Sequence, residues 1–178
     1  EHNLVVPFHY FGITDIQSLD YENVDLLKVD ELAKLLNVNK RVDFIIEQMN
    51  FYSFNGNKRK VIGFCVSKEH CSFMSKSFND KGINASYLTS DDSVLKRVEN
   101  IKKLEDENDS LEVIFTVDIF NEGIDIPSIN TVLFLRPTNS PIVFIQQLGR
   151  GLRKHKNKEF LTVLDFIGNH KKAYLIAL

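Results

Sequence analysis

Val61-Ile62-Gly63-Phe64-Cys65-Val66 is a short apolar run that Ser67 follows directly. The run has the length of one strand and shows no polar side chain on either face, as a strand buried in a parallel sheet requires. Ser67 is a preferred N-cap residue, so a helix of about 14 residues is predicted after it. Gly82 then stands where helices commonly end. This stretch therefore predicts a strand followed at once by a helix.

The same alternation continues toward the C-terminus. Further strands are predicted at 85–88, 112–116, 131–135 and 160–166, and helices at 91–104 and 140–152. Strands that alternate with helices form parallel βαβ units with right-handed crossovers. We therefore predict an α/β fold with a mostly parallel central sheet for residues 60–178.

Residues 1–59 have a different pattern, and we predict that they form a partly helical N-terminal extension. An aromatic extended segment, Pro7–Gly12, comes first, and helical stretches follow at 30–36 and 40–51. The turn Asn55–Lys58 marks the predicted internal boundary. The chain begins at Glu1 and not at a methionine, as expected for a piece of a longer protein.

Composition limits the class of protein. The sequence is 43% hydrophobic and 26% charged, which is ordinary for a soluble globular domain, and it has neither a run near 18 apolar residues nor a signal peptide. Cys65 and Cys71 match no zinc spacing, so no metal site is expected. We interpret both as reduced core thiols, which fits a cytoplasmic protein without a membrane segment.

Glutamine, glycine and arginine are concentrated in one segment, Gln146-Gln147-Leu148-Gly149-Arg150-Gly151-Leu152-Arg153. In a helix, Gln146, Arg150 and Arg153 share one face because they are spaced four and three residues apart. Each guanidinium is planar, always charged and able to bind two phosphate oxygens. The segment predicts a phosphate-binding face; an exposed polar face that ends at a glycine cap is the alternative.

A second segment, 115–127, follows a predicted strand, at the edge where parallel sheets bind ligands. It holds the carboxylates Asp118, Glu122 and Asp125 around Gly123, and glycine permits a positive φ. Such a loop can bind a metal ion, a ribose hydroxyl or an arginine. A solvated acidic loop is the alternative.

A third segment, 64–70, joins a strand to a helix through Ser67-Lys68. The backbone N–H groups at a helix start can hold an anion. Ordinary helix capping explains the same residues equally well.

In order and spacing, the three segments resemble conserved motifs of the second motor domain of superfamily 2 helicases. Phe64–Ser67 resembles motif IV, Thr116–Pro127 motif V, and Gln146–Arg153 motif VI in its Q-x-x-G-R-x-x-R form. Together with Leu133–Thr138, motif V looks closest to bacterial DEAD/DEAH-type helicases with a phospholipase-D-like nuclease module, and is similar to restriction-enzyme motor subunits. The resemblance, over about residues 60–167, implies a RecA-like three-layer sandwich.

The resemblance also implies roles for single residues at an ATP site. Arg150 and Arg153 would be arginine fingers that reach the γ-phosphate, and Gln146 would orient them or the attacking water. Gly123 and Asp125 would lie on the ribose side of the cleft.

Ser67, Lys68 and Thr116 would contact the nucleic-acid backbone. This chain departs from the family pattern at two places. Many relatives have a threonine directly before the motif V aspartate, where this chain has Val117. Thr89-Ser90 replaces the usual glycine before the second helix.

Two sequence patterns of complete ATP sites do not occur: G-x-x-x-x-G-K-[ST] and D-E-x-[DH]. The resemblance therefore implies that ATP and Mg²⁺ are held mainly by a preceding RecA-like domain, in cis, and that this chain alone is inactive. The aromatic segment Pro7–Gly12 resembles the lead-in from that domain. As part of the full-length ATP-dependent helicase, the chain is expected to bind nucleic acid, DNA in preference to RNA.

Two other classes of function are open at this point. A non-catalytic RecA-like domain that docks nucleic acid or protein need not keep both Arg150 and Arg153. A flavodoxin-like enzyme needs a phosphate loop after its first strand, and 65–69 contains no glycine. The net charge of −2 is a poor signature for nucleic-acid binding, so the basic patch Arg150–Lys158 must supply it; an exposed loop is the alternative.

Overall fold

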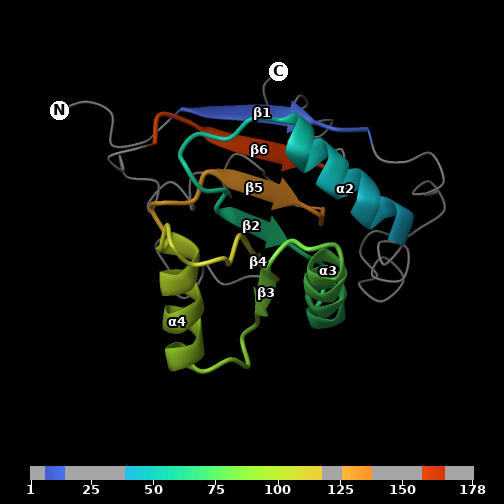
Figure 1. Ribbon diagram of the computed structural model, residues 1–178. Coiled ribbons are helices and arrows are strands. Elements are labelled where there is room, and N and C mark those ends of the chain that lie inside the picture. The colour runs from blue at the N-terminus through green and yellow to red at the C-terminus, as the bar shows by residue number, and fades with distance from the viewer. Residues whose placement is uncertain (1–6, 15–38, 118–125, 138–157, 167–178) are drawn as a thin grey trace, which may run out of the picture.

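The structure is a computed structural model that describes residues 7–14, 39–117, 126–137 and 158–166. Its elements in chain order are β1 (Phe8–Gly12), α2 (Asn39–Phe51), β2 (Val61–Phe64), α3 (Lys68–Asp80), β3 (Ala85–Leu88), α4 (Val94–Glu105), β4 (Val113–Thr116), β5 (Thr131–Phe134) and β6 (Leu161–Asp165). The described strands form one sheet in the order β1-β6-β5-β2-β4-β3, and every neighbouring pair is parallel (Figure 1). The predicted α/β fold with a parallel central sheet is confirmed.

The predicted strand and helix around Ser67 are both present. The strand ends at Phe64, two residues earlier than expected, and the helix runs for 13 residues. The hydroxyl of Ser67 caps the helix by accepting a hydrogen bond from the backbone N–H of His70 at 3.1 Å. Gly82 follows the C-cap residue with φ of +79°, a left-handed conformation that other L residues adopt at a cost.

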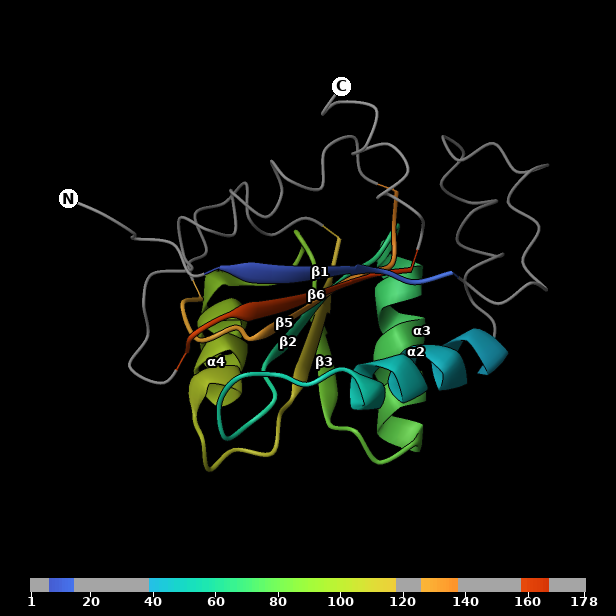
Figure 2. The same cartoon turned by 90° about the horizontal axis from the view of Figure 1, so that it is seen from above.

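Helices cover both faces of the sheet. Figure 2 shows α2 and α3 together on one side and α4 apart from them on the other. Since side chains alternate along a strand, each strand contributes to two separate apolar cores. The core under α2 and α3 includes Met74, Phe78 and Phe115, and the other includes Phe64 and Phe134. The arrangement has three layers.

Two elements that precede residue 60 take part in this architecture. The strand β1 pairs with β6 alone, from Phe8 opposite Leu161 to Gly12 opposite Asp165. It is therefore the outermost strand on one side of the described sheet. The apolar face of α2 is fully buried in the core that it shares with α3. The domain boundary after residue 59 stays a prediction, and the helices predicted at 30–36 and 140–152 lie outside the described residues.

Both cysteines are free and buried, as the sequence predicted for core thiols. Burial raises the pKa of the Cys65 thiol well above its usual range, which keeps that thiol protonated and unreactive. Among the residues that the structure describes, no helix is long and apolar enough to cross a membrane.

Candidate functional site

The carboxyl ends of all described strands meet at one edge of the sheet, because every pair is parallel. Thr116 ends β4, and Ser67 and Lys68 follow β2 after a short loop. The in-register pairing of Phe64 with Thr116 places these two neighbouring strand ends side by side. The structure thus brings the three predicted nucleic-acid contacts to one edge. The predicted nucleotide-site residues lie outside the described residues: Gly123, Asp125, Gln146, Arg150 and Arg153.

Hydrogen bonds with His70 hold the loop from β2 to α3 at Ser67 and at the residue before it, Val66. His70, the third residue of the helix, donates its backbone N–H to the Ser67 hydroxyl at 3.1 Å. Its ring Nδ1 accepts the backbone N–H of Val66 at 3.3 Å. The arrangement resembles a capping box with histidine in place of glutamate or glutamine, except that the ring accepts from Val66, the residue before the N-cap, and not from the N-cap Ser67 itself. The loop therefore has a defined backbone conformation at the start of the helix.

The imidazole of His70 is neutral and fully buried. Burial lowers its pKa to about 3, and the nearby positive charge of Arg41 acts in the same direction. Because Nδ1 accepts a hydrogen bond, the ring proton is on Nε2. That Nε2 has no hydrogen-bond partner within the described part of the chain. Arg41 belongs to α2 and is itself fully buried, so α2 supplies the charge that acts on this ring.

Lys68 is the one predicted contact with a substantially exposed side chain. Its ammonium pairs with Asp91, which follows β3, and 48% of the lysine side chain is accessible. An exposed ion pair of this kind contributes under about 1 kcal/mol, so a phosphate can replace Asp91 at little cost. Both residues of the pair line a groove of about 540 Å³ between α3 and the end of β3, together with Glu69, Ser72, Phe73, Tyr87 and Thr89.

Thr116 is fully buried at the end of β4. Its hydroxyl has no hydrogen-bond partner among the described residues, whereas most buried hydroxyls have one. The described structure shows this hydroxyl inside the protein and not at the surface. The contact of Thr116 with nucleic acid therefore stays a prediction.

Arg136 is a residue at this edge that the sequence reasoning missed. It follows β5, and its guanidinium donates to the backbone carbonyl of Val117 at 2.7 Å. The bond ties the chain leaving β5 to the chain leaving β4, where the motif V segment begins. An arginine directly before a proline, Pro137, at a strand end was the available signal in the sequence.

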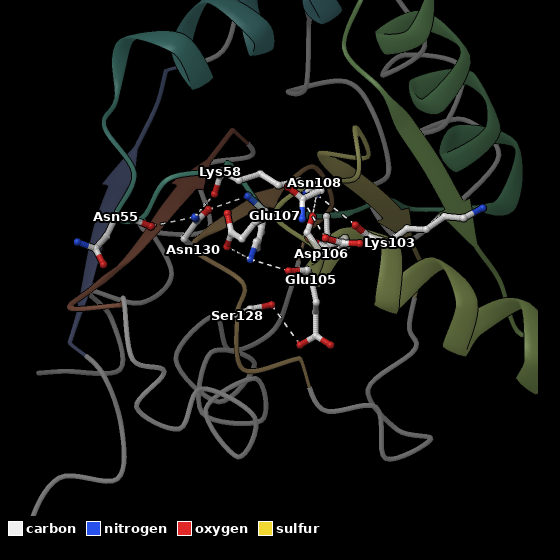
Figure 3. Close-up of polar contacts among 11 residues, drawn as sticks. Asn55, Lys58, Lys103, Glu105, Asp106, Glu107, Asn108, Ser128 and Asn130 are labelled. Atoms are coloured by element: carbon white, nitrogen blue, oxygen red, sulfur yellow. Dashed lines mark hydrogen bonds and ion pairs between the residues drawn. The ribbon is translucent and has the colours of Figure 1, made fainter.

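The opposite, amino edge of the sheet carries a separate polar network (Figure 3). Lys58 donates to the carbonyls of Lys103, Leu104 and Asp106 at 2.7 to 3.3 Å, and Lys60 donates to that of Glu105 at 2.9 Å. Two ammonium groups thus satisfy the carbonyls that the C-terminus of α4 leaves unpaired and complement its dipole. This network anchors α4 to the start of β2.

Asn130 joins the same network to β5 (Figure 3). Its side-chain oxygen accepts the backbone N–H of Lys60 at 2.9 Å, and its side-chain nitrogen donates to the carbonyls of Asn55 and Lys58 at 2.9 and 2.7 Å. Asn130 is 3% exposed, so these bonds are made in a desolvated site. We therefore assign Asn130 a role in stability. It lies at the amino ends of the strands, away from the candidate site at their carboxyl ends. No group of three or more potential metal ligands gathers among the described residues.

Comparison with models of protein families identifies the family of this chain. The model of the helicase conserved C-terminal domain matches residues 32–155, which include α2 and most of the described sheet. The chain belongs to this family. The resemblance to the C-terminal domain of superfamily 2 helicases is therefore confirmed.

Two curated relatives cover most of the chain. One is the Saccharomyces cerevisiae protein named "Putative ATP-dependent helicase IRC3", which is 33% identical over 156 residues, 88% of this chain and 22% of its own length. The other is UvrABC system protein B of Kosmotoga olearia, 31% identical over 152 residues, 81% of this chain and 22% of its own length. The chain spans about a fifth of the length of these relatives.

Solved structures show the same fold. A fragment of "a putative HsdR subunit of a type I restriction enzyme from Vibrio vulnificus YJ016" superimposes with a TM-score of 0.70 at 20% identity, covering 96% of this chain and 34% of that chain. The RNA helicase Prp28 from Chaetomium thermophilum bound to ADP gives 0.62 at 18% identity, with 99% and 36% covered. Identities this low show fold alone, and they confirm the predicted RecA-like architecture.

Proposed function

We propose that this chain is the second motor domain of an ATP-dependent nucleic-acid helicase or translocase. The observation that carries the proposal is the convergence at the carboxyl edge of the sheet. There the exposed Lys68 and the capped helix start at Ser67 stand beside the end of β4, from which the motif V segment continues. In a parallel sheet this edge is where phosphate-bearing ligands bind.

The proposed ATP site is shared between two domains. Arg150 and Arg153 act as arginine fingers on the γ-phosphate, Gln146 orients them or the attacking water, and Gly123 with Asp125 lies on the ribose side. A preceding RecA-like domain holds the phosphates and Mg²⁺, because this sequence has no phosphate loop of the G-x-x-x-x-G-K-[ST] type. Phosphoryl transfer depends mostly on positioning and charge stabilisation, so a domain that supplies fingers completes such a site without forming one alone.

The proposed polyanion is a nucleic acid, with DNA preferred to RNA. Restriction enzymes are among the structural neighbours, and one of them, the Type ISP enzyme LlaBIII, was solved bound to DNA. Ser67, Lys68 and Thr116 form part of the nucleic-acid track in this proposal. The free, buried thiols of Cys65 and Cys71 fit a reducing cytoplasm.

The test compares Arg150→Ala and Arg153→Ala with Arg59→Ala in the full-length protein. Arg59 is a matched control because it lies before β2 at the amino edge, where it donates to Asn50 at 2.9 Å. We expect each finger variant to lose DNA-stimulated ATP hydrolysis by roughly 10³-fold or more, and Arg59→Ala to retain it. The 178-residue chain by itself should show no ATPase activity. Normal hydrolysis in both finger variants would refute the proposal.

A non-catalytic docking domain is the alternative function. It predicts nucleic-acid or protein binding by the full-length protein with no ATP hydrolysis at all. The same assay on the unaltered protein therefore separates the two.

A further inference from the structure

We infer that His70 is a positioning residue for the loop Val66–Lys68, holding the backbone in the conformation that contacts the nucleic acid. The inference rests on the proposed function, which makes this loop part of the nucleic-acid track. His70 itself is fully buried and touches no ligand in this role.

One residue makes two of the hydrogen bonds that hold the loop. The backbone of His70 donates to the hydroxyl of Ser67 at 3.1 Å, and the ring accepts from the backbone of Val66 at 3.3 Å. The first bond depends only on the presence of a backbone N–H, so any residue other than proline would keep it. The second needs a side-chain acceptor that reaches back over the first turn. The side chain of His70 is thus the specific part of the clamp.

The clamp needs a neutral ring with a free lone pair on Nδ1. The burial of His70 and the adjacent charge of Arg41 both disfavour the charged imidazolium, and they keep Nδ1 an acceptor at neutral pH. Arg41 comes from α2, whereas the loop joins β2 to α3. The charge that α2 supplies through Arg41 therefore helps to keep the ring of His70 a hydrogen-bond acceptor for the loop.

The geometry is tested first by nitrogen-15 spectroscopy of histidine in the unaltered protein, with His70→Gln used to assign the signal. We expect the Nε2–H tautomer for His70, unchanged between about pH 8 and pH 5, whereas an ordinary histidine titrates near 6.5. An Nδ1–H tautomer, or titration near pH 6.5, would overturn the inference, because either state removes the acceptor.

The functional test measures binding of a labelled single-stranded DNA oligonucleotide and DNA-stimulated ATP hydrolysis by the full-length protein. His70→Leu removes the acceptor and keeps an apolar side chain. It should raise both the Kd and the KM for DNA about five-fold while kcat changes little. His70→Gln restores an acceptor of the usual capping-box type and should return both constants to within about two-fold of the unaltered protein.

A matched control is Ser75→Ala on the same helix. Its hydroxyl donates to the carbonyl of Ala85 at 3.1 Å, away from the loop, so its loss should lower the melting temperature without changing the KM for DNA. Equal Kd values for His70→Leu and the unaltered protein would refute the positioning role of His70 and leave the proposed function standing. Failure of the unaltered protein to bind either single-stranded DNA or single-stranded RNA would refute the proposed function, and the inference with it. Loss of binding that glutamine does not restore would show that the acceptor is not what matters.

Discussion

Gly63 and Phe115 face each other in register on the neighbouring strands β2 and β4. A Cβ atom on Gly63 would lie 2.5 Å from Cδ1 and 2.7 Å from Cε1 of the Phe115 ring, closer than carbon atoms approach without displacement. The ring is fully buried and meets Phe78 of α3 edge to face, at 5.0 Å between centroids. The glycine therefore makes space for an aromatic side chain that connects the sheet to α3.

Replacing this glycine should overpack the core. We expect Gly63→Ala to lower the free energy of unfolding by about 1–3 kcal/mol, measured by urea denaturation. Adding Phe115→Leu to Gly63→Ala should recover at least about 1 kcal/mol of the free energy of unfolding relative to the sum of the two single effects. The smaller side chain can move away from the new methyl group. Gly82→Ala is the control: its φ of +79° carries a cost of about 1 kcal/mol, but nothing lies within 4 Å of its Cβ, so Phe115→Leu should not relieve it. Independent effects of Gly63→Ala and Phe115→Leu would contradict this account.

Asn130 should be among the polar residues on which stability depends most. Asn130→Ala removes three hydrogen bonds to backbone groups, besides a longer one from the Thr131 hydroxyl, and leaves the N–H of Lys60 and the carbonyls of Asn55 and Lys58 without this partner. At about 1 kcal/mol each, the loss should be roughly 3 kcal/mol in the free energy of unfolding. Asn108→Ala, at an exposed position near the same network, should change it by under about 0.5 kcal/mol. Similar effects at both positions would show that the network is not stabilising.

How far the sequence predicts these features depends on the range of the interactions. The central strands and the helix after Ser67 were predictable because apolar runs and caps are local signals. The strand Phe8–Gly12 was assigned to an extension, since its partner β6 lies some 150 residues away along the chain and a pairing of that range leaves no local signal in the sequence. Arg41 reads as a surface charge beside Lys40, and only the packing of α2 buries it. Asn130 belongs to no periodic pattern, so its backbone partners Asn55, Lys58 and Lys60 could not be inferred from the sequence.

Thr116 offers a direct test of one predicted site residue. Since its buried hydroxyl has no partner among the described residues, Thr116→Val should leave the free energy of unfolding unchanged or raise it by up to about 1 kcal/mol. If the hydroxyl contacts nucleic acid in the full-length protein, as proposed, the same variant should weaken binding by about five-fold or more, measured by fluorescence anisotropy at low salt. Thr116→Ser keeps the hydroxyl and should retain the affinity while losing about 1 kcal/mol of stability. An unchanged affinity in the valine variant would remove Thr116 from the nucleic-acid track.

Lys158 should make stability depend on pH in the alkaline range. Its ammonium donates to the carbonyl of Pro127 at 3.2 Å, the residue is 8% exposed, and burial lowers its pKa to about 7. In the unfolded chain the pKa of lysine is about 10.4, so between about pH 7 and pH 10 the unfolded state binds more protons than the folded state. The free energy of unfolding therefore rises with pH through this window.

Lys158→Met should remove this dependence. At pH 7 the variant should be more stable than the unaltered chain by roughly 2–4 kcal/mol, because no ammonium has to be neutralised or desolvated on folding. The advantage should shrink toward pH 10, where the lysine is largely neutral in both states and the lost bond to Pro127 leaves the variant equal or slightly weaker. Urea midpoints at pH 7, 8.5 and 10 measure the trend, with Lys76→Met on the exposed face of α3 expected to follow the unaltered chain at every pH. A difference between Lys158→Met and the unaltered chain that stays constant from pH 7 to pH 10 would mean that Lys158 keeps its charge when folded.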